Sequence, residues 1–329
     1  MSRINDGNVQ VIIVNWNNKT LLSECLAGLK YQTYPSFSTI VVDNGSTDGS
    51  VEFVTQEHPD VKLIALSENL GFAAANNIAI QNTNADYFAL LNNDAVPHPD
   101  WLKNLIAALE NQPNAGSAAS KMLFYHNPER IDRTGDAYTL AGTGWLRGRG
   151  KDSSCYQKQE LVFGACAGAA LYRASMLRDI GCFDADYFLL YEDVDLSFRA
   201  QLKGFQCVFV PEAVVYHKSS ASIGHDSPVS VYYSQRNLEW TYMKNMPLHL
   251  IAVTIIPHLF YVLASGFFFA LSGRGGDFLR AKRDAFAGLK KMVQKRGEIQ
   301  KTKTVSNAYL FGIFEKEYLF PRLIRRFKR

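Results

Sequence analysis

Acidic side chains occur at two places in the 329-residue chain where they could do chemistry, around residues 94 and 193. Asp94 closely follows an apolar run at 87–91. At such a strand end a carboxylate can hold a hard divalent cation through oxygen ligands beside a diphosphate. The cation would neutralise the charge that develops on a departing diphosphate. The alternative is a helix cap before residues 97–109, which Asp100 could supply equally well.

The second acidic cluster consists of Glu192, Asp193 and Asp195, three carboxylates within four positions and flanked by aromatic residues. This setting favours a general base with a perturbed pKa. The alternative is a solvated helix start, where the macrodipole favours acidic residues. Both can hold, because a helix start can present a carboxylate to a cleft.

Polar residues also follow each apolar run in the first third of the chain. They include Asn15, Asp43, Asn44, Gly71, Asn76 and Asn93. Ligands collect at the carboxyl ends of parallel strands, so these residues are candidates for a nucleotide site. A carboxylate such as Asp43 can accept hydrogen bonds from a base or ribose, and a glycine lets the backbone approach a ligand. Taken singly, each of these loops could equally be a turn.

Two further residues could contact a phosphate or a metal. His217 ends an apolar run, but spacing alone assigns it no role. Arg236 could grip a phosphate bidentately or could be an ordinary surface arginine.

The elements that must position these residues alternate between apolar runs and amphipathic stretches, as in βαβ units. We predict strands at 9–16, 39–42, 61–66 and 87–91, and helices at 21–31, 49–57 and 72–81. This order predicts an α/β fold with an open, mostly parallel sheet and right-handed crossovers. Residues 127–159 are rich in Gly, Arg, Asp and Ser, which predicts a long surface loop that serves as a lid or an acceptor-binding element.

Composition predicts a folded protein with one large domain and an appendage, since 47% of residues are hydrophobic and 20% are charged. The five cysteines are odd in number and never form a C-x-x-C pair, which disfavours a disulfide framework and a zinc cage. Residues 1–8 are short and polar and lack a signal-peptide pattern. We therefore expect the catalytic part to stay in the cytoplasm.

Charge divides the chain unevenly. From Arg274 onward there are 16 basic and 5 acidic residues, a net charge of +11, whereas the preceding residues carry −7. Basic tails usually meet phosphates, either of nucleic acid or of anionic lipid.

The segment between Lys244 and Arg274 contains no charged residue, and it is long enough to form a transmembrane helix. Pro257 and Gly266 would interrupt such a helix, and a single span would place the basic tail on the far side of the membrane. We therefore predict interfacial or re-entrant insertion.

The tail itself supports a membrane role. Residues 278–296 show the pattern of a basic amphipathic helix, which suits an anionic membrane surface. The alternative is a helical pair that packs on the domain or on a second subunit of a homo-oligomer. No nucleic-acid-binding module is recognisable, so we expect no nucleic-acid partner. These patterns divide the chain into a catalytic domain at 1–247 and a membrane-associating helical region at 248–329.

The ordered set of motifs resembles the family 2 inverting glycosyltransferases with the GT-A fold. The motifs are VIIVNWN, VVDNGSTDGS, NLGFAAANN, LLNND, GACAGAALYR, GCFDADYFLLYEDVDLSFRA, VVYHKSS and YYSQRN. Within that family they are most similar to the rhamnosyltransferase-like branch that builds bacterial cell-surface polysaccharides, such as cell-wall glycan and lipopolysaccharide. The resemblance covers residues 9–247.

The resemblance implies roles for single residues. Asn15, Asp43 and Asn76 would line the nucleotide pocket. Asp94 would be the metal-binding end of the D-x-D element, in which Asn92 replaces the first aspartate. Asp193 would be the catalytic base with Glu192 and Asp195 in support, and His217 would complete the metal or diphosphate site.

The implied activity transfers a sugar from a nucleotide-diphosphate donor, with dTDP or UDP as the nucleotide and rhamnose as the sugar suggested by the branch. Mg²⁺ or Mn²⁺ would be the cofactor, and a lipid-linked glycan the acceptor. Transfer would take place at the cytoplasmic face of the cell membrane, with the protein bound as a peripheral or monotopic enzyme. The rival predictions are a nucleotidyltransferase, which would normally show a glycine-rich basic loop after the first strand, and an inactive nucleotide-sugar-binding protein.

Overall fold

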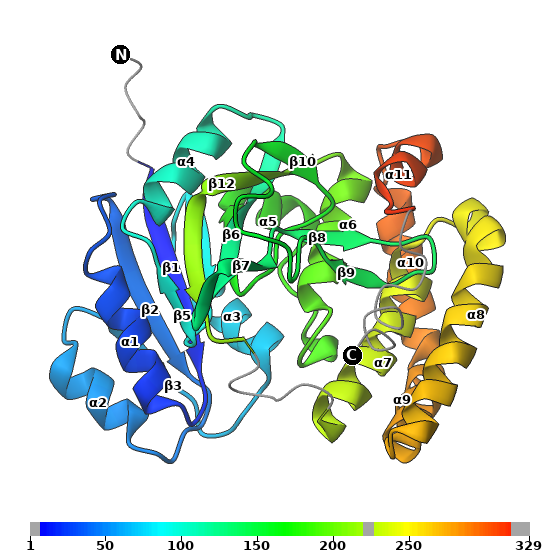
Figure 1. The fold of residues 1–329 in the computed structure, drawn as a ribbon, viewed down its shortest axis with the longest axis horizontal. Coiled ribbons are helices and arrows are strands. Elements are labelled where there is room, and N and C mark those ends of the chain that lie inside the picture. Colours follow the sequence, from blue (N-terminus) through cyan, green and yellow to red (C-terminus); the bar gives the residue numbers. More distant parts are fainter. Residues whose placement is uncertain (1–6, 220–226, 317–329) are drawn as a thin grey trace.

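The computed structural model describes residues 7–219 and 227–316. The last part of the basic tail therefore lies outside the described residues. A ten-stranded mixed sheet forms the centre of the molecule, in the order β10-β12-β6-β11-β4-β1-β2-β3, with β5 paired to β12 and β7 to β6. Helices cover both faces, and the C-terminal helices stand together at one end (Figure 1).

The N-terminal half of the sheet is entirely parallel. Its strands are β1 (Val9–Asn15), β2 (Phe37–Asp43), β3 (Lys62–Ala65) and β4 (Tyr87–Leu91). The helices that connect or follow them are α1 (Lys19–Leu29), α2 (Ser50–Glu57), α3 (Phe72–Gln81) and, after the short strand β5 (Ala95–Pro97), α4 (Trp101–Glu110). The central strand β4 is apolar throughout, and β1 is mostly apolar, because both faces of the sheet are covered there. The predicted βαβ order is confirmed.

The other half of the sheet mixes strand directions. Its strands are β6 (Ala115–Phe124), β7 (Asn127–Arg133), β10 (Glu160–Val162), β11 (Ala169–Arg173) and β12 (Gln206–His217). Strand β12 runs parallel to β6, whereas β11 runs antiparallel between β4 and β6. Six of the ten strands, β1 to β4, β6 and β12, point the same way, so the sheet is mostly parallel, as predicted.

The prediction of a surface loop at 127–159 is wrong for much of its length. The segment contains β7 and the hairpin of β8 (Asp136–Tyr138) and β9 (Gly144–Leu146). Ile131, Asp132 and Tyr138 are fully buried. Many of its buried residues are polar, so the alternation of apolar residues that marks a strand is missing.

Helices form the C-terminal part of the molecule. They follow α5 (Ala174–Ile180) and α6 (Glu192–Lys203) and comprise α7 (Pro228–Asn245), α8 (Leu248–Leu271), α9 (Gly275–Ala287), α10 (Leu289–Lys301) and α11 (Asn307–Ile313). The single amphipathic helix predicted at 278–296 is wrong, because the chain breaks at Gly288. A Cβ at Gly288 would lie 2.6 Å from the Trp240 ring, so α7 packs directly against this break.

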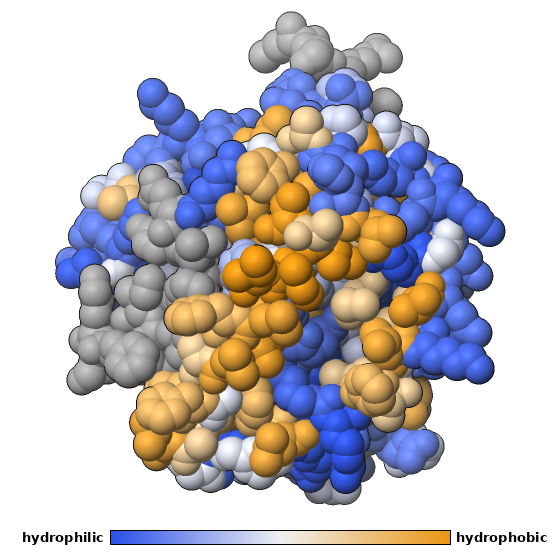
Figure 2. Space-filling view, turned by 90° about the vertical axis from the view of Figure 1, so that its right-hand side faces the viewer, coloured by the Kyte–Doolittle hydropathy of each residue, from blue (hydrophilic) through white to orange (hydrophobic). Residues whose placement is uncertain are grey.

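Among the described residues, only α8 is long and apolar enough to cross a membrane. Its inner face packs on the domain through buried residues that include Leu250, Tyr261 and Phe269. Its outer face carries exposed Ile256 and Leu263 among other large apolar side chains. Figure 2 looks at the molecule from this end and shows hydrophobic side chains gathered across the face, with hydrophilic ones beside them.

Candidate functional site

Three predicted residues meet where β1, β2 and β4 end. Asn15 and Asp43 are register partners on adjacent parallel strands, and Asn15 Nδ2 donates to Asp43 Oδ2 at 3.0 Å. Asn93 Nδ2 donates to Asn15 Oδ1 at 2.8 Å. Asn44 follows Asp43 directly and donates from Nδ2 to Asn69 Oδ1. The strand-end residues therefore form one hydrogen-bonded group at the carboxyl edge of the sheet.

Gly71 and Asn76 have packing roles in this structure. Gly71 has a φ of +84°, and a Cβ there would lie 2.6 Å from Phe188. Phe72 N donates to Phe188 O at 2.7 Å, so the start of α3 touches the segment before α6. Asn76 is buried and donates from Nδ2 to Phe72 O within its own helix. Their contact with a nucleotide stays a prediction.

Asp94 and His217 are brought together by the pairing of β5 with β12, which sets Ala95 opposite His217. His217 Nε2 lies 3.1 Å from Asp94 Oδ1 but has no hydrogen-bond partner. His217 Nδ1 lies 2.7 Å from Asp132 Oδ2. Burial favours the neutral imidazole, but these two carboxylates outweigh it and raise the pKa of His217 to about 9.

These two side chains fit a divalent cation. His217 Nε2 is a buried nitrogen without a hydrogen bond beside a carboxylate oxygen of Asp94. The carboxylate oxygen suits Mn²⁺ or Mg²⁺, and an imidazole that has lost its proton is a common metal ligand. The carboxylate of Asp132 would orient the imidazole from behind. Asp94 and His217 would therefore hold the metal.

A second group of donor atoms fits a metal less well. Atoms of Asp136, Cys166 and Asp193 lie within 4.8 Å of one another. Arg133 Nη1 already lies 2.7 Å from Cys166 Sγ and 3.4 Å from Asp136 Oδ1. Because a guanidinium already supplies positive charge to this group, a divalent ion would be repelled there.

The three carboxylates at the start of α6 differ sharply in their surroundings. Asp195 is fully buried and pairs with Lys244 at 2.7 Å and with Arg199 at 2.9 Å. Burial alone would raise its pKa, but those cations hold it well below its usual range. Glu192 is buried with Oε2 unpartnered, and burial together with Asp193 raises its pKa well above the usual value. Only Asp193 is partly exposed, so it alone of the three can reach a substrate.

The two acidic clusters lie on the same edge of the sheet. Asn92 N donates to Gly168 O at 2.9 Å, and Ala167 N donates to Asp193 Oδ2 at 3.2 Å. The turn at residues 166–168 thus joins the strand end that carries Asp94 to the carboxylate of Asp193.

The segment just before α6 has an unusual backbone. Phe188, Leu190 and Tyr191 all have positive φ values, of 61°, 65° and 71°. Asn237 Nδ2 donates to the carbonyls of residues 187, 189 and 190. Arg236 Nη2 donates to the carbonyls of residues 186 and 187. Arg236 therefore clamps the segment that presents Asp193, and its predicted contact with a phosphate stays a prediction.

Sequence reasoning missed the residues that β7 and β8 contribute. Asp132 is bonded to both His217 and Arg149, and Asp136 faces Asp193 with Oδ2 unpartnered. Burial is the main reason that the pKa of Asp136 is raised to about 7. Their only sequence signal was a concentration of charged residues in a segment without apolar periodicity, and that signal favoured a loop.

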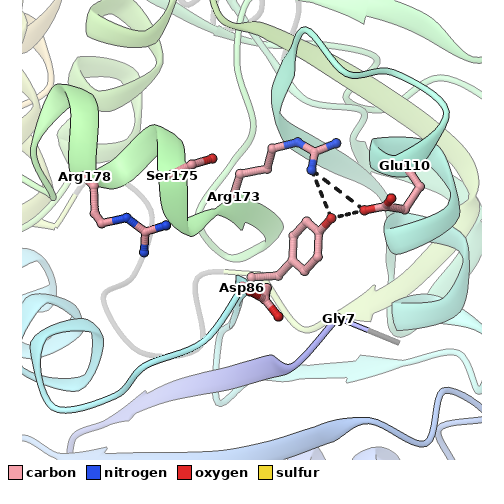
Figure 3. Close-up of a pocket in the computed structure, with 7 residues that line it drawn as sticks. Gly7, Asp86, Glu110, Arg173, Ser175 and Arg178 are labelled. Carbon is pink, nitrogen blue, oxygen red and sulfur yellow. Dashed lines mark hydrogen bonds and ion pairs between the residues drawn. The ribbon is translucent and has the colours of Figure 1, made fainter. Parts of the chain in front are cut away.

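A separate polar pocket of about 540 Å³ lies at the opposite edge of the sheet, where β4 begins (Figure 3). There Arg173 reaches the hydroxyl of Tyr87 at 3.0 Å and the carboxylate of Glu110 at 3.8 Å. Asp86, Ser175 and Arg178 also line it. None of the predicted site residues lines this pocket.

The comparisons with known proteins agree with the architecture. Residues 10–181 match the model of glycosyl transferase family 2, and the chain belongs to this family. It is a glycosyltransferase of the rhamnosyltransferase-like branch. One relative is the N-acetylglucosaminyl-diphospho-decaprenol L-rhamnosyltransferase of Mycobacterium tuberculosis. It is 28% identical over 243 residues, which cover 66% of this chain and 78% of the relative.

Solved structures confirm the GT-A fold. A mannosyltransferase from Pyrobaculum calidifontis, solved with GDP-Man and Mn²⁺, has a TM-score of 0.56 and 17% identity over 90% of this chain and 86% of its own. Residues 1–349 of TarS from S. aureus, in complex with UDP, give a TM-score of 0.53 and 18% identity over 90% of each chain.

Proposed function

We propose that this glycosyltransferase moves a sugar from a nucleotide-diphosphate donor to a hydroxyl of a lipid-linked glycan, with inversion at the anomeric carbon. The observation that carries the proposal is the position of Asp193, partly exposed and two hydrogen bonds away from the strand end that bears Asp94. A base and a diphosphate site on one edge of the sheet are what a single displacement requires.

In this mechanism Asp193 accepts the proton of the acceptor hydroxyl while that oxygen attacks the anomeric carbon. The nucleotide diphosphate leaves from the opposite face through an oxocarbenium-like state, so the configuration inverts. Asp94 and His217 bind the divalent cation, which when bound neutralises charge on the leaving diphosphate. Asn15, Asp43 and their neighbours bind the nucleoside, with rhamnose on dTDP as the proposed donor.

The base assignment is tested with Asp193→Asn. The substitution is nearly isosteric and removes the proton acceptor, so we expect turnover to fall by about 10²- to 10⁴-fold. Nucleotide affinity, measured by calorimetry with Mn²⁺, should stay close to that of the wild type. Turnover at the wild-type level in the variant would refute the assignment.

The donor is tested by thermal stabilisation with dTDP, UDP and GDP, each with and without Mn²⁺ or Mg²⁺. A ligand that binds only the folded state raises the melting temperature. We expect the largest shift with dTDP and metal together. A larger shift with GDP, or none that depends on metal, would contradict this choice of donor.

The acceptor and the location are proposed from two features. The rhamnosyltransferase relative is named for a diphospho-decaprenol acceptor. The outer face of α8 exposes large apolar side chains, and residues 248–329 are proposed to hold the catalytic part on the cytoplasmic face of the membrane. Inner-face contacts of α8 favour an in-plane position over a span, because Thr254 and His258 are hydrogen-bonded to α7.

A further inference from the structure

A basic cavity of about 450 Å³ lies beside the β8–β9 hairpin and has no role in donor binding or proton transfer as described above. The turn after β9 and the chain after α11 form its walls. Its lining residues with charged or aromatic side chains are Trp145, Arg147, Arg149, Lys151, Tyr156, Glu160, Phe314, Glu315 and Lys316.

The cavity carries more positive than negative charge. Four basic and two acidic side chains line it, although the chain up to Gly273 has a net charge of −7. Arg147 and Arg149 are only 15% and 13% exposed, so their charges act in a partly desolvated space. Gly148 and Gly150 have positive φ values and form the tight turn that lets three successive basic side chains line one cavity.

Aromatic rings hold the basic groups in position. The guanidinium of Arg147 stands 4.2 Å from the centre of the Tyr156 ring, and Lys151 Nζ stands 5.2 Å from it. Lys151 Nζ also donates to the Tyr156 hydroxyl at 3.1 Å. Arg147 also pairs with Glu160 and donates to Thr134, and Arg149 pairs with Asp132, so the two guanidinium groups are fixed by protein acceptors. Lys151 and Lys316 are therefore the cavity cations best placed to meet phosphate oxygens.

The cavity adjoins the reaction site on two sides. Arg149 pairs with Asp132, which holds His217 at the metal site. Gly144, beside Trp145 on β9, donates from its backbone to the hydroxyl of Tyr191 next to the start of α6. These contacts therefore connect the cavity to His217 and to the start of α6, the helix that carries Asp193.

The hairpin also connects the cavity to the apolar end of the molecule. His258 of α8 lies with Nδ1 2.9 Å from Ala141 O, between β8 and β9. A ligand with a charged part in the cavity could extend its lipid past this hairpin towards the outer face of α8.

We propose that this cavity binds the diphosphate of the acceptor, which places the acceptor sugar at Asp193 and the lipid towards α8. The inference rests on the proposed function, since it names where the acceptor of that reaction is held. It also gives the segment at 127–159 an acceptor-binding role, although as ordered structure instead of a loop.

The test compares Lys151→Glu and Lys316→Glu with Lys158→Glu, an exposed lysine of the same segment that does not line the cavity. Transfer is measured to a diphosphate-linked lipid acceptor and to a neutral alkyl glycoside of the same sugar. Each cavity variant should reduce the preference for the diphosphate acceptor, as a ratio of kcat/KM values, by about tenfold or more. Lys158→Glu should keep the wild-type ratio. An unchanged ratio in folded cavity variants would overturn the proposal.

Binding supplies a readout that does not depend on activity. Methylenediphosphonate is titrated into the full-length protein in the presence of EDTA, so that a metal at Asp94 and His217 cannot contribute. We expect binding to the wild type and to Lys158→Glu, with a loss of about tenfold in each cavity variant. If the protein binds the probe in this way but transfers no sugar, the proposed function fails while the cavity site stands.

The phosphate of a membrane lipid headgroup resembles the diphosphate of the acceptor. Vesicle binding distinguishes these two ligands. Binding to phosphatidylcholine vesicles with and without phosphatidylglycerol is measured for the same variants. Under the proposal the cavity variants bind both vesicles like the wild type. A loss of binding confined to vesicles with phosphatidylglycerol, with the acceptor preference intact, would assign the cavity to a headgroup and overturn the proposal.

Discussion

Single residues in the first turn of α6 show how environment separates chemically similar groups. Glu192, Asp193 and Asp195 lie within four positions, yet the first is buried with one carboxylate oxygen unpartnered, the second is partly exposed and the third is held between two cations. The residue pattern alone predicted a general base within this cluster and the resemblance pointed to Asp193, but a physical distinction among the three needs their burial and contacts. The contacts of Asp195, for example, include an ion pair with Lys244, which lies 49 positions away in the sequence.

Asp195→Asn should therefore impair folding more than chemistry. The substitution takes the carboxylate from buried Arg199 and leaves Asp184 as the carboxylate beside buried Lys244, which we expect to lower the free energy of unfolding by about 3 to 5 kcal/mol. Urea denaturation of the two asparagine variants checks this. Asp193→Asn is the matched control and should unfold close to the wild type. Equal stability of the Asp195 variant and the wild type would contradict the structural role.

Asp132→Asn should weaken the proposed metal site without replacing either of its proposed ligands. Asp132 orients the imidazole of His217, and loss of such a partner commonly lowers metal affinity by 10- to 100-fold. Mn²⁺ binding with dTDP present, followed by electron paramagnetic resonance, measures the change. An unaltered Mn²⁺ affinity would remove Asp132 from the metal site.

At the scale of elements, a charged group joins three of the C-terminal helices. Glu239 of α7 pairs with His258 of α8 and with Lys282 of α9. Burial would raise the pKa of Glu239, but Lys282 and His258 lower it to about 2. These contacts hold α8 along the domain with its apolar face outward.

The group makes stability depend on pH in acid. A carboxylate with a lowered pKa stabilises the fold above its unfolded pKa of 4.5, and the contribution disappears as pH falls through about 2. Acidification across this window should cost the wild type up to about 3 kcal/mol from this residue. Glu239→Gln should show a flatter profile over the same window in urea titrations. Parallel profiles would contradict the assignment.

The break between α9 and α10 gives a second element-scale prediction. Gly288→Ala places a methyl group against Trp240 and should destabilise the protein by about 1 to 3 kcal/mol. Gly297→Ala in α10 meets open space and should be neutral or stabilise by up to about 1 kcal/mol. Thermal melts of the pair check the direction. A melting temperature for Gly288→Ala as high as that of the control would show that the Trp240 ring of α7 moves to make room for the methyl group.

At the scale of the whole molecule, the sequence predicted the parallel half well and the mixed half poorly. Strands β1, β2 and β4 are apolar runs buried on both faces, so their pattern is unambiguous. Strand β7 begins with four exposed residues and buries Asp132, so its pattern is that of a loop. The half of the site built on β1 to β4 was predictable, whereas Asp132 and Asp136 depend on tertiary pairing that local pattern does not encode.

The proposed membrane binding would depend on the assembled molecule as well. Ile256→Glu combined with Leu263→Glu puts charge on the outer face of α8 and should reduce sedimentation with anionic vesicles by about tenfold or more. Leu161→Glu, on the exposed side of β10, is the control and should sediment like the wild type. Equal sedimentation of the two would exclude the α8 face as the contact.

The positive φ values at Phe188, Leu190 and Tyr191 carry a consequence for evolution and engineering. Non-glycine residues in this conformation cost of order 1 kcal/mol or more each, and the chain tolerates three of them next to the proposed base. Leu190→Gly would relieve part of that cost and could raise thermal tolerance, but it would also loosen the hold on the start of α6. A variant selected for heat resistance at this turn would then hold the carboxylate of Asp193 less firmly in place.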